Sequence, residues 1–347
     1  MPGILEEDYL NIANSSDFNK DELFGSTVLI TGATGLVGMF LAKSLIYMNT
    51  ACNAGIKLIL PVRNKNKADD LYKNTDLKDV TFIYGDITEE PKVEGDVDYI
   101  IHCASNTTSK YMVTNPVETL HISYEGTRQM LKLAADKKVK SMVYVSSMEV
   151  YGATKEEDNP ITEDKLGFIN VHNVRSSYSE GKRICELLCS SYASEYGVPV
   201  KMARLAQTFG AGVPSSDTRV FAQFARSVIN GTDIVLHTKG ESVGNYCYTA
   251  DVVRGILCLL TKGEDGEAYN VVNENTSMMI REVASMVSEE IAEGKIKVIF
   301  DIPEQNAFGY APDTKMRLSS KKINELGWKA SYDLPDMYRR MISYWEE

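Results

Sequence analysis

Apolar residues along the first part of this 347-residue chain gather in two kinds of block. Short runs of consecutive apolar residues predict buried β-strands, and longer stretches with apolar residues every three or four positions predict helices. The predicted strands span residues 27–30, 57–60, 81–84, 98–102, 141–145 and 200–204. The predicted helices span residues 36–47, 118–137 and 178–196.

Strands that alternate with helices in this way are joined by right-handed crossovers and form a parallel sheet. We therefore predict an α/β fold in which residues 25–208 form a Rossmann-type, doubly wound parallel sheet that binds NAD(P). Beyond Phe209 the alternation loosens, and residues 209–347 are expected to form mainly a smaller C-terminal lobe for the substrate. The chain is expected to cross between the two lobes more than once.

The first 24 residues are an N-terminal extension before the first strand. Their apolar positions predict one short helix on the surface of the domain: Ile4, Leu5, Leu10 and Ile12. Such a helix could contact a second subunit, but a cover over the sheet is the favoured interpretation.

Composition narrows the classes of function. The chain has 37 Lys and Arg against 48 Asp and Glu, and its formal net charge of −11 provides no basic excess for nucleic-acid phosphates. We find no apolar run near the roughly 20 residues of a membrane span, and no secretory signal in residues 1–24. The six cysteines lack paired metal spacing, since Cys185 and Cys189 have no second pair nearby. We therefore expect a cytoplasmic protein with reduced cysteines and no metal site.

The segment between the first strand and the first helix reads Thr31-Gly-Ala-Thr-Gly-Leu-Val-Gly38. Glycines in such a strand-to-helix turn bind a dinucleotide: the first takes a tight backbone turn, the second lets the pyrophosphate approach, and the third lets the helix pack closely. The helix amino terminus then offers N–H groups to the phosphates. The predicted cofactor contacts in this turn are Gly32, Thr34, Gly35, Leu36, Val37 and Gly38. The alternative is a tight turn that binds no ligand.

The ends of the next strands indicate which dinucleotide binds. An acidic residue after the second strand would bind the ribose 2′-hydroxyl of NAD, but Arg63 stands there. Because a guanidinium can pair with a 2′-phosphate, NADP is favoured over NAD. In the alternative, Arg63 lies over the adenine. Asp86 is placed to accept from the adenine amino group, and Ile87, Ala104 and Ser105 complete the predicted cofactor site.

Tyr178 and Lys182 are four residues apart and therefore lie on one face of the last predicted helix. A tyrosine has an ordinary pKa of about 10, but a neighbouring ammonium and the nicotinamide charge both favour its phenolate. Tyr178 is therefore the predicted base that takes a proton from a substrate hydroxyl while a hydride passes to the nicotinamide. Ser147, just past the fifth strand, would share a hydrogen bond with that hydroxyl. The alternative is an ordinary side-chain pair on a helix surface.

Motifs between Ser26 and Trp328 carry a family resemblance: TGATGLVG, GDIT, HCAS, VSSMEVYG, YSEGK, MARLAQTFG and YTADV. The chain resembles the extended short-chain dehydrogenase/reductase family of nucleotide-sugar epimerases, dehydratases and decarboxylases. It is most similar to UDP-glucuronate decarboxylases, through residues 115–116, 125–127, 175–178, 182–183 and 219–224. The resemblance implies that Ser147 and Tyr178 act on the sugar C4 hydroxyl with support from Lys182. It also implies a homodimer formed through helices 118–137 and 178–196.

Glu149 bears on the reaction that follows oxidation. The resemblance to dehydratases and decarboxylases implies that its carboxylate stands near sugar C5, whose proton becomes acidic once C4 is a ketone. The 4,6-dehydratases carry an aspartate acid before this glutamate. This chain has Met148 there, which favours decarboxylation or epimerisation over loss of water. In the alternative, a helix amino terminus satisfies Glu149.

Two residues depart from the family pattern where relatives bind substrate phosphates. Gly244 stands in place of an arginine that contacts the pyrophosphate, and Gln207 stands in place of an asparagine. Either another cation substitutes or the substrate is not an ordinary nucleotide sugar. The predicted substrate-binding residues are Ser147, Glu149, Gln207, Arg219 and Arg317. Arg204, at the end of a predicted strand, has either a structural or a functional role.

The leading hypothesis is an NAD(P)-dependent enzyme that oxidises a nucleotide sugar at C4 and then decarboxylates or epimerises it. The alternative is an NADPH-dependent reductase of a keto sugar or sugar phosphate, which Arg63, Met148 and the missing phosphate arginine support. A third hypothesis is a non-catalytic dinucleotide-binding regulator, and the presence of Ser147, Tyr178 and Lys182 argues against it.

Overall fold

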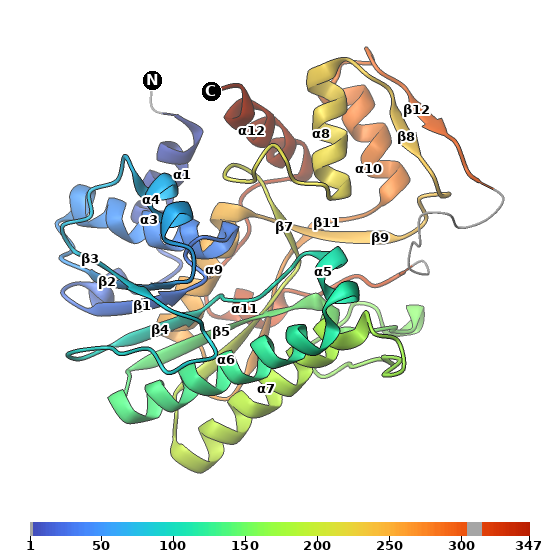
Figure 1. Cartoon of the computed structure of the whole chain (residues 1–347). Helices are drawn as coiled ribbons and strands as arrows, with labels where there is room; N and C mark the ends of the chain where they lie inside the picture. Colours follow the sequence, from blue (N-terminus) through green and yellow to red (C-terminus); the bar gives the residue numbers. More distant parts are fainter. Residues whose placement is uncertain (1–2, 304–313) are drawn as a thin grey trace.

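The computed structural model describes residues 3–303 and 314–347. A parallel sheet of seven strands forms its centre, in the order β10-β6-β5-β4-β1-β2-β3 (Figure 1). The strands are β1 (Thr27–Thr31), β2 (Lys57–Val62), β3 (Val80–Tyr84), β4 (Tyr99–His102), β5 (Ser141–Ser147), β6 (Val200–Leu205) and β10 (Ala268–Val271). Because the order reverses at β1, as it does in Rossmann folds, the predicted fold class is confirmed.

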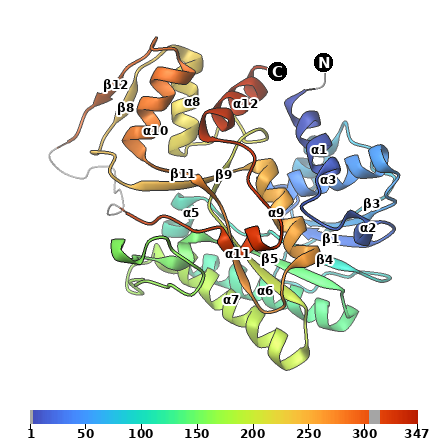
Figure 2. The same ribbon diagram turned by 180° about the vertical axis from the view of Figure 1, so that it is seen from behind.

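Helices cover both faces of this sheet (Figures 1 and 2). The two longest, α6 and α7, pack side by side on one face, and α3, α4 and α9 cover the other. Their bounds are α3 (Leu36–Cys52), α4 (Lys65–Tyr72), α6 (Pro116–Lys137), α7 (Ser176–Tyr196) and α9 (Thr249–Lys262). With both faces covered, strand β4 buries all of its residues. Short helical segments lie in the connections: α2 (Lys20–Leu23), α5 (Ser109–Thr114), η1 (Met148–Tyr151), η2 (Glu156–Asp158) and α11 (Lys321–Glu325).

The N-terminal helix α1 (Ile4–Asn14) packs against helices α3, α9 and α12 (Leu334–Glu346). The favoured prediction of a cover over the sheet is therefore wrong. A buried carboxylate supplies the reason, because Asp8 accepts hydrogen bonds from the Tyr248 hydroxyl (2.6 Å) and the Arg340 guanidinium (2.8 Å). These bonds satisfy the buried charge and hold the first helix against the last.

The second half of the chain contributes a smaller lobe built on two short sheets. The first has the order β11-β9-β7 and the second pairs β12 with β8. The elements of this lobe are β7 (Gln207–Phe209), α8 (Val220–Asn230), β8 (Ile234–Leu236), β9 (Val243–Tyr248), β11 (Asn273–Met279), α10 (Ile280–Met286), η3 (Val287–Ile291) and β12 (Val298–Phe300). Because β7 begins two residues after β6 ends, the lobe stands at the carboxyl edge of the large sheet. Between β9 and β11, α9 and β10 rejoin the large sheet.

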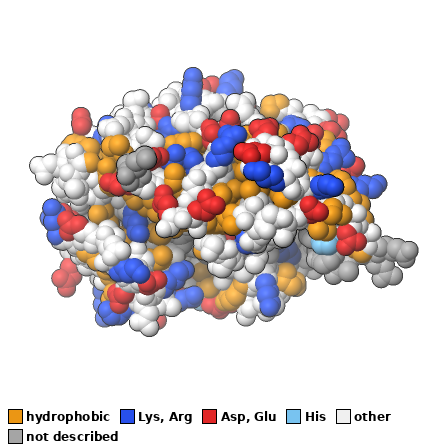
Figure 3. All heavy atoms as spheres, turned by 90° about the horizontal axis from the view of Figure 1, so that it is seen from above, with side chains coloured by type: hydrophobic (Ala, Val, Ile, Leu, Met, Phe, Trp, Pro, Cys, Tyr) orange, Lys and Arg blue, Asp and Glu red, His pale blue; other side chains and the backbone are white. Residues whose placement is uncertain are grey.

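The surface carries both signs of charge. On the face that Figure 3 shows, acidic and basic side chains are interspersed with apolar ones. Within residues 3–303 and 314–347, no helix combines the length and the apolar character that a membrane span requires.

Candidate active site

The glycine turn after β1 is shaped by two close backbone approaches. Gly32 has a positive φ of +69°, and a Cβ atom there would lie 2.8 Å from the backbone nitrogen of Ala104. A Cβ atom on Gly38 would lie 2.4 Å from the Gly32 carbonyl oxygen. Any side chain at either position would therefore push α3 or the end of β4 away from the turn.

Gly35 differs from these two glycines. Its virtual Cβ atom meets only the Gly32 carbonyl oxygen, at 3.4 Å, and the residue is exposed. It precedes the first turn of α3, where Leu36 and Val37 present backbone N–H groups that have no acceptor within the helix. An open glycine beside free N–H groups at a helix amino terminus fits the pyrophosphate of a dinucleotide. Thr34 lies half-buried in the same turn.

A buried histidine, which sequence reasoning missed, joins this turn to the neighbouring strand. His102, the last residue of β4, places Nδ1 2.7 Å from the Thr31 hydroxyl and Nε2 3.3 Å from the Thr127 hydroxyl. The Thr31 hydroxyl also accepts from the backbone N–H of Ala104 (3.1 Å), and Ser105 follows half-buried. Burial, reinforced by the charge of Lys182, lowers the pKa of His102 to about 3, so the ring is neutral.

Arg63 and Asp86 lie together at the carboxyl ends of β2 and β3. The Arg63 side chain is 75% exposed, and its Nη1 atom is 3.9 Å from Asp86 Oδ2. Hydrogen bonds from the backbone and side chain of Thr88 hold the Asp86 carboxylate and keep its pKa below the usual range. Next to it, Ile87 packs so closely on α6 that a Cβ atom on Gly126 would lie 3.2 Å from its side chain. The exposed guanidinium and the fixed carboxylate suit the adenosine end of a dinucleotide.

Ser147, Tyr178 and Lys182 meet at the carboxyl end of β5. Ser147 is the last residue of that strand, and its side chain is hydrogen-bonded to Tyr178 in the first turn of α7. One turn further along α7, Lys182 donates from Nζ to the Val145 carbonyl oxygen (2.7 Å). Its ammonium lies 5.8 Å from the centre of the Tyr178 ring. Strand β5 therefore holds both the serine and the support for the lysine.

The combined effect of burial and nearby charges on the pKa of Tyr178 differs from the sequence-based expectation. Burial raises the pKa of Tyr178, as does the charge of Glu149, while the hydrogen bond with Ser147 and the charge of Arg175 lower it. Burial also lowers the pKa of Lys182. In the protein alone, desolvation outweighs the nearby cations and Tyr178 is a protonated phenol. With an oxidised cofactor bound, the positive nicotinamide would supply an additional charge that favours the phenolate.

Glu149 is bound by two side chains that sequence reasoning did not assign, Arg175 just before α7 and Ser179 in its first turns. Arg175 donates to both carboxylate oxygens of Glu149, at 2.8 and 3.0 Å, and the Ser179 hydroxyl donates to one of them at 2.9 Å. Glu149 is therefore satisfied at the start of a helix, but mainly by a guanidinium rather than by backbone N–H groups. The only signal in the sequence was the position of Arg175, three residues before Tyr178.

The predicted substrate residues of the smaller lobe are more dispersed. Arg219 pairs with Asp217 through its Nε and Nη2 atoms, and its charge still acts on Tyr178. Arg317 is exposed and donates to the Ser277 carbonyl oxygen (2.8 Å). Gln207 is exposed at the start of β7. No described contact joins these three side chains to one another.

The absence of a side chain at Gly244 has a local cause. A Cβ atom on Gly244 would lie 2.2 Å from the hydroxyl oxygen of Tyr246, two residues along the same face of β9. The buried ring of Tyr246 therefore occupies the space that an arginine at position 244 would need. Between them, Asn245 is fully buried and accepts from the backbone N–H of Leu318 (2.9 Å).

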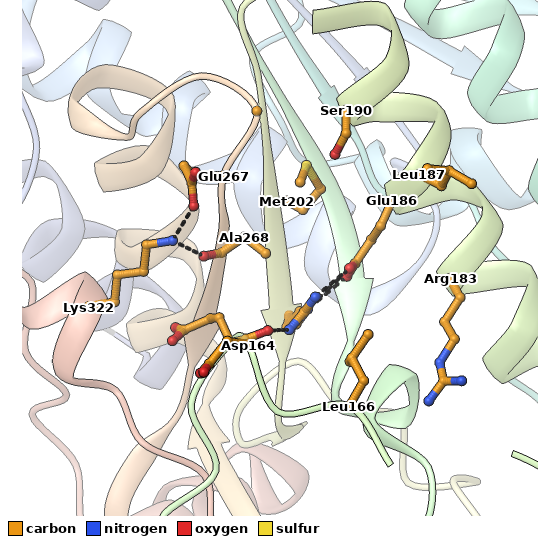
Figure 4. A pocket seen from close by; sticks show the side chains of 13 residues that line it. Asp164, Leu166, Arg183, Glu186, Leu187, Ser190, Met202, Glu267, Ala268 and Lys322 are labelled. Atoms are coloured by element: carbon orange, nitrogen blue, oxygen red, sulfur yellow. Dashed lines mark hydrogen bonds and ion pairs between the residues drawn. The ribbon is translucent and has the colours of Figure 1, made fainter. Parts of the chain in front are cut away.

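Arg204 has a structural role. Its guanidinium donates to both carboxylate oxygens of Glu186 and to the Tyr151 hydroxyl (3.0 Å), and its side chain is 6% exposed. It lines a cavity of about 540 Å³ between α7, β6 and β10, and Ser147 is not among the lining residues (Figure 4). Lys322, another charged group of this cavity, pairs with Glu267. Because its cations are already paired, we do not assign this cavity to the cofactor or the substrate.

Comparison with known proteins places the chain in a family. The profile of the NAD dependent epimerase/dehydratase family matches residues 28–272. UDP-glucuronic acid decarboxylase 6 of Arabidopsis thaliana is 30% identical over 309 residues, which cover 88% of this chain and 85% of that protein.

Two solved structures extend the comparison to the fold. One is a UDP-N-acetylglucosamine 4-epimerase from Methanobrevibacter ruminantium in complex with UDP-N-acetylmuramic acid, with a TM-score of 0.77, 19% identity, and coverage of 92% of this chain and 98% of that one. The other is RMD from Pseudomonas aeruginosa complexed with NADPH, with a TM-score of 0.71, 23% identity, and coverage of 92% and 99%. These findings confirm the resemblance read from the motifs. The chain is an enzyme of the NAD dependent epimerase/dehydratase family, within the extended short-chain dehydrogenases/reductases.

Proposed function

We propose that this enzyme oxidises the C4 hydroxyl of a nucleotide-linked sugar, decarboxylates or epimerises the resulting 4-keto sugar, and then reduces C4 again. The observation that carries the proposal is the meeting of Ser147, Tyr178 and Lys182 at the carboxyl end of β5, the same edge of the parallel sheet as the glycine turn that follows β1. The similarity to a UDP-glucuronic acid decarboxylase supports a nucleotide sugar as the substrate.

In the first step, Tyr178 takes the proton of the C4 hydroxyl. The NAD(P) cofactor supplies a hydride acceptor, and later a hydride donor, next to C4. Ser147 forms a second hydrogen bond with the C4 oxygen, and this bond holds the oxygen next to Tyr178. Lys182 places a buried positive charge near the phenol ring, which favours the phenolate that accepts the proton. The product of this step is a 4-keto sugar and a protonated Tyr178.

In the decarboxylation that we favour, a C6 carboxylate is β to this ketone. The C5–C6 bond breaks, CO2 leaves, and the electron pair of that bond spreads over C5, C4 and the C4 oxygen as an enolate. Tyr178 and Ser147 donate hydrogen bonds to that oxygen. A proton from water then adds to C5, C4 is reduced, and Tyr178 returns its proton to the C4 oxygen. In epimerisation at C5, Glu149 would instead remove the C5 proton, and a proton from water would then add to the opposite face of C5.

Both NAD and NADP fit the family, and we propose a preference for NADP. The support is the exposed guanidinium of Arg63 at the end of β2, where a 2′-phosphate would stand. The fold neighbour RMD is a complex with NADPH, whereas the name of the family specifies NAD.

A net reductase of a keto sugar or sugar phosphate is the second candidate. It is favoured by the tyrosine ring that fills the position of the pyrophosphate arginine at Gly244. The two candidates differ in stoichiometry. An enzyme that oxidises and then reduces C4 recycles its cofactor, whereas a reductase consumes one NADPH for each product, and absorbance at the reduced nicotinamide band distinguishes the two.

The Tyr178→Phe variant tests the proposed base. We expect turnover to fall by roughly a thousandfold, because loss of a general acid–base group typically costs 10²- to 10⁴-fold. The dissociation constant of the cofactor should stay nearly unchanged, because the ring and its packing remain. Product formation by mass spectrometry and cofactor titration measure the two quantities.

Tyr196→Phe is the matched control, since Tyr196 lies at the exposed end of the same helix. It should leave turnover unchanged. Full turnover in the Tyr178→Phe variant would remove Tyr178 from the mechanism.

A further inference from the structure

The ion pair between Glu149 and Arg175 is bidentate, partly exposed to solvent, and next to Tyr178. Its side chains are 32% exposed for Arg175 and 37% for Glu149, against 6% and 11% in the buried pair of Arg204 with Glu186. A half-exposed ion pair adds only about 0–1 kcal/mol to the free energy of unfolding. The fold therefore gains little from the pair, while the site gains an accessible guanidinium.

We propose that Arg175 recognises a carboxylate on the sugar, so that the substrate of this enzyme is a nucleotide-linked uronic acid. This inference rests on the proposed function, because Tyr178 and Ser147 must hold the C4 hydroxyl. The C6 carboxylate of a uronic acid is attached to C5, the carbon next to C4. Arg175 stands in the turn of chain that leads into Tyr178, with its guanidinium carbon 5.9 Å from the centre of the Tyr178 ring. If Glu149 faces C5, the guanidinium of Arg175 that binds Glu149 also lies near C5. A substituent of C5, such as the C6 carboxylate, would then lie on the same side of the site as Arg175.

Arg175 has N–H groups that remain available to donate to a substrate carboxylate. A guanidinium carries five N–H groups and can bind two carboxylates, one against the two Nη atoms and one against Nε and a neighbouring Nη. Among the side chains that the structure describes, Arg175 donates only to Glu149, from Nη1 and Nη2. The edge formed by Nε and the remaining Nη hydrogens is the proposed place of the substrate carboxylate.

The balance of charge also favours an anionic sugar. Glu149 and Arg175 cancel each other, as do Asp217 and Arg219. Lys182 remains as a buried cation that donates only to a neutral carbonyl oxygen. While Tyr178 is protonated, as it is in the protein alone, a neutral hexose would leave this cluster with one positive charge, whereas a uronate makes it neutral. Without Arg175, the substrate carboxylate would meet the negative charge of Glu149 in a partly desolvated site.

The test compares uronate and neutral-hexose partners carried on the same nucleotide, with cofactor bound. The probes are the glucuronate and glucose forms of UDP and dTDP and the mannuronate and mannose forms of GDP, with dissociation constants measured by calorimetry. We expect the wild type to bind one uronate more tightly than its hexose partner. Arg175→Gln should reduce that preference roughly tenfold or more, on the scale of a charged hydrogen bond. Arg175→Lys, which keeps the charge but loses the planar fork, should restore part of it.

Two further variants make the test specific. Arg128→Gln removes the same kind of pair elsewhere, since Arg128 binds Glu125 with two donors and is 38% exposed. It should leave the preference unchanged. Glu149→Gln frees both Nη atoms of Arg175, and we expect it to strengthen uronate binding while hexose binding stays the same. An opposite result for Glu149→Gln would count against the proposed geometry.

The outcomes separate this inference from the proposed function. If the wild type binds uronates and hexoses equally, or if Arg175→Gln weakens the binding of both equally, Arg175 does not recognise the substrate carboxylate. Neither result contradicts the proposed function. If the wild type binds none of the nucleotide sugars, the proposed function fails and the inference fails with it.

Discussion

The three glycines in the turn after β1 have three different surroundings. Gly32 needs a positive φ and a close contact with Ala104, and Gly38 needs to lie against the Gly32 carbonyl oxygen. Gly35 meets no such demand from the protein, because its virtual Cβ atom has only an ordinary contact at 3.4 Å. At the residue scale, the local spacing of glycines was thus enough to predict the turn, and the space beside Gly35 is what suits a ligand.

Arg63 gives a prediction at the same scale. In the Arg63→Ala variant, the dissociation constant of NADP should rise roughly tenfold or more, which is the effect of losing one charged hydrogen bond. The constant for NAD should change much less, because NAD carries a hydroxyl where NADP carries the phosphate. Fluorescence titration with both cofactors measures the two values.

Lys73→Ala provides a control for the loss of a surface cation nearby, since the exposed Lys73 pairs with Asp70 of α4. It should alter neither constant. Equal losses for NADP and NAD in the Arg63 variant would mean that Arg63 lies over the adenine instead.

At the scale of elements, the buried ring of His102 links the end of β4 to β1 and α6. Its two nitrogens face the hydroxyls of Thr31 and Thr127. A neutral ring with one N–H can serve both hydroxyls as donor and acceptor, whereas a charged ring would lose its acceptor. The link therefore depends on the protonation state of His102.

This dependence predicts how stability changes with pH. The unfolded chain takes up a proton at the ordinary histidine pKa of about 6.5, whereas the folded His102 does so only at about 3. The unfolded state therefore binds more protons between these values, and stability falls as the pH falls. This single group should lower the free energy of unfolding by up to about 1.4 kcal/mol per pH unit below about pH 6.

His102→Gln isolates the effect, because an amide can donate and accept but does not titrate. Urea unfolding between about pH 5 and about pH 7 should show a shallower loss of stability in this variant than in the wild type. His172→Gln alters an exposed histidine and should keep the wild-type slope. Identical slopes in all three proteins would show that His102 is not the group responsible.

At the scale of the whole molecule, α6 and α7 leave an apolar surface exposed on the outside of the large sheet. Its residues are Val117, Leu120, Tyr124, Ile184 and Leu187, between 41% and 80% exposed. They lie on the two helices that pack side by side. Apolar side chains gathered on neighbouring helices are typical of a contact between subunits.

We therefore predict that the protein is a dimer that buries this surface. In the Leu120→Glu variant each copy would place a carboxylate in the contact, which costs about 3 kcal/mol or more and weakens association at least about a hundredfold. Analytical ultracentrifugation measures the mass. Ile229→Glu is the matched control, because Ile229 is equally exposed on α8. A monomeric wild type, or a Leu120→Glu variant that remains a dimer, would contradict this assignment.

The elements of the first half were predictable because their sequence signal is local. The predicted strand at 57–60 extends to Val62 in β2, and the predicted helix at 36–47 extends to Cys52 in α3. The sequence did not place β10 at the edge of the large sheet, because its four residues follow a long excursion through the smaller lobe. Its partner β6 lies more than sixty residues earlier in the chain.

The sequence by itself determined the class of fold, the glycine turn and the spacing of Tyr178 and Lys182, because each depends on neighbours within a few residues. The tertiary structure alone decided which distant groups meet. It placed Arg175 on Glu149, Arg340 on Asp8, and the ring of Tyr246 over Gly244. The first two contacts depend on how packed elements bring separate segments together, and the third depends on which way a buried ring turns. The chemistry of the site follows from such contacts, since they decide which charges are free to face a substrate.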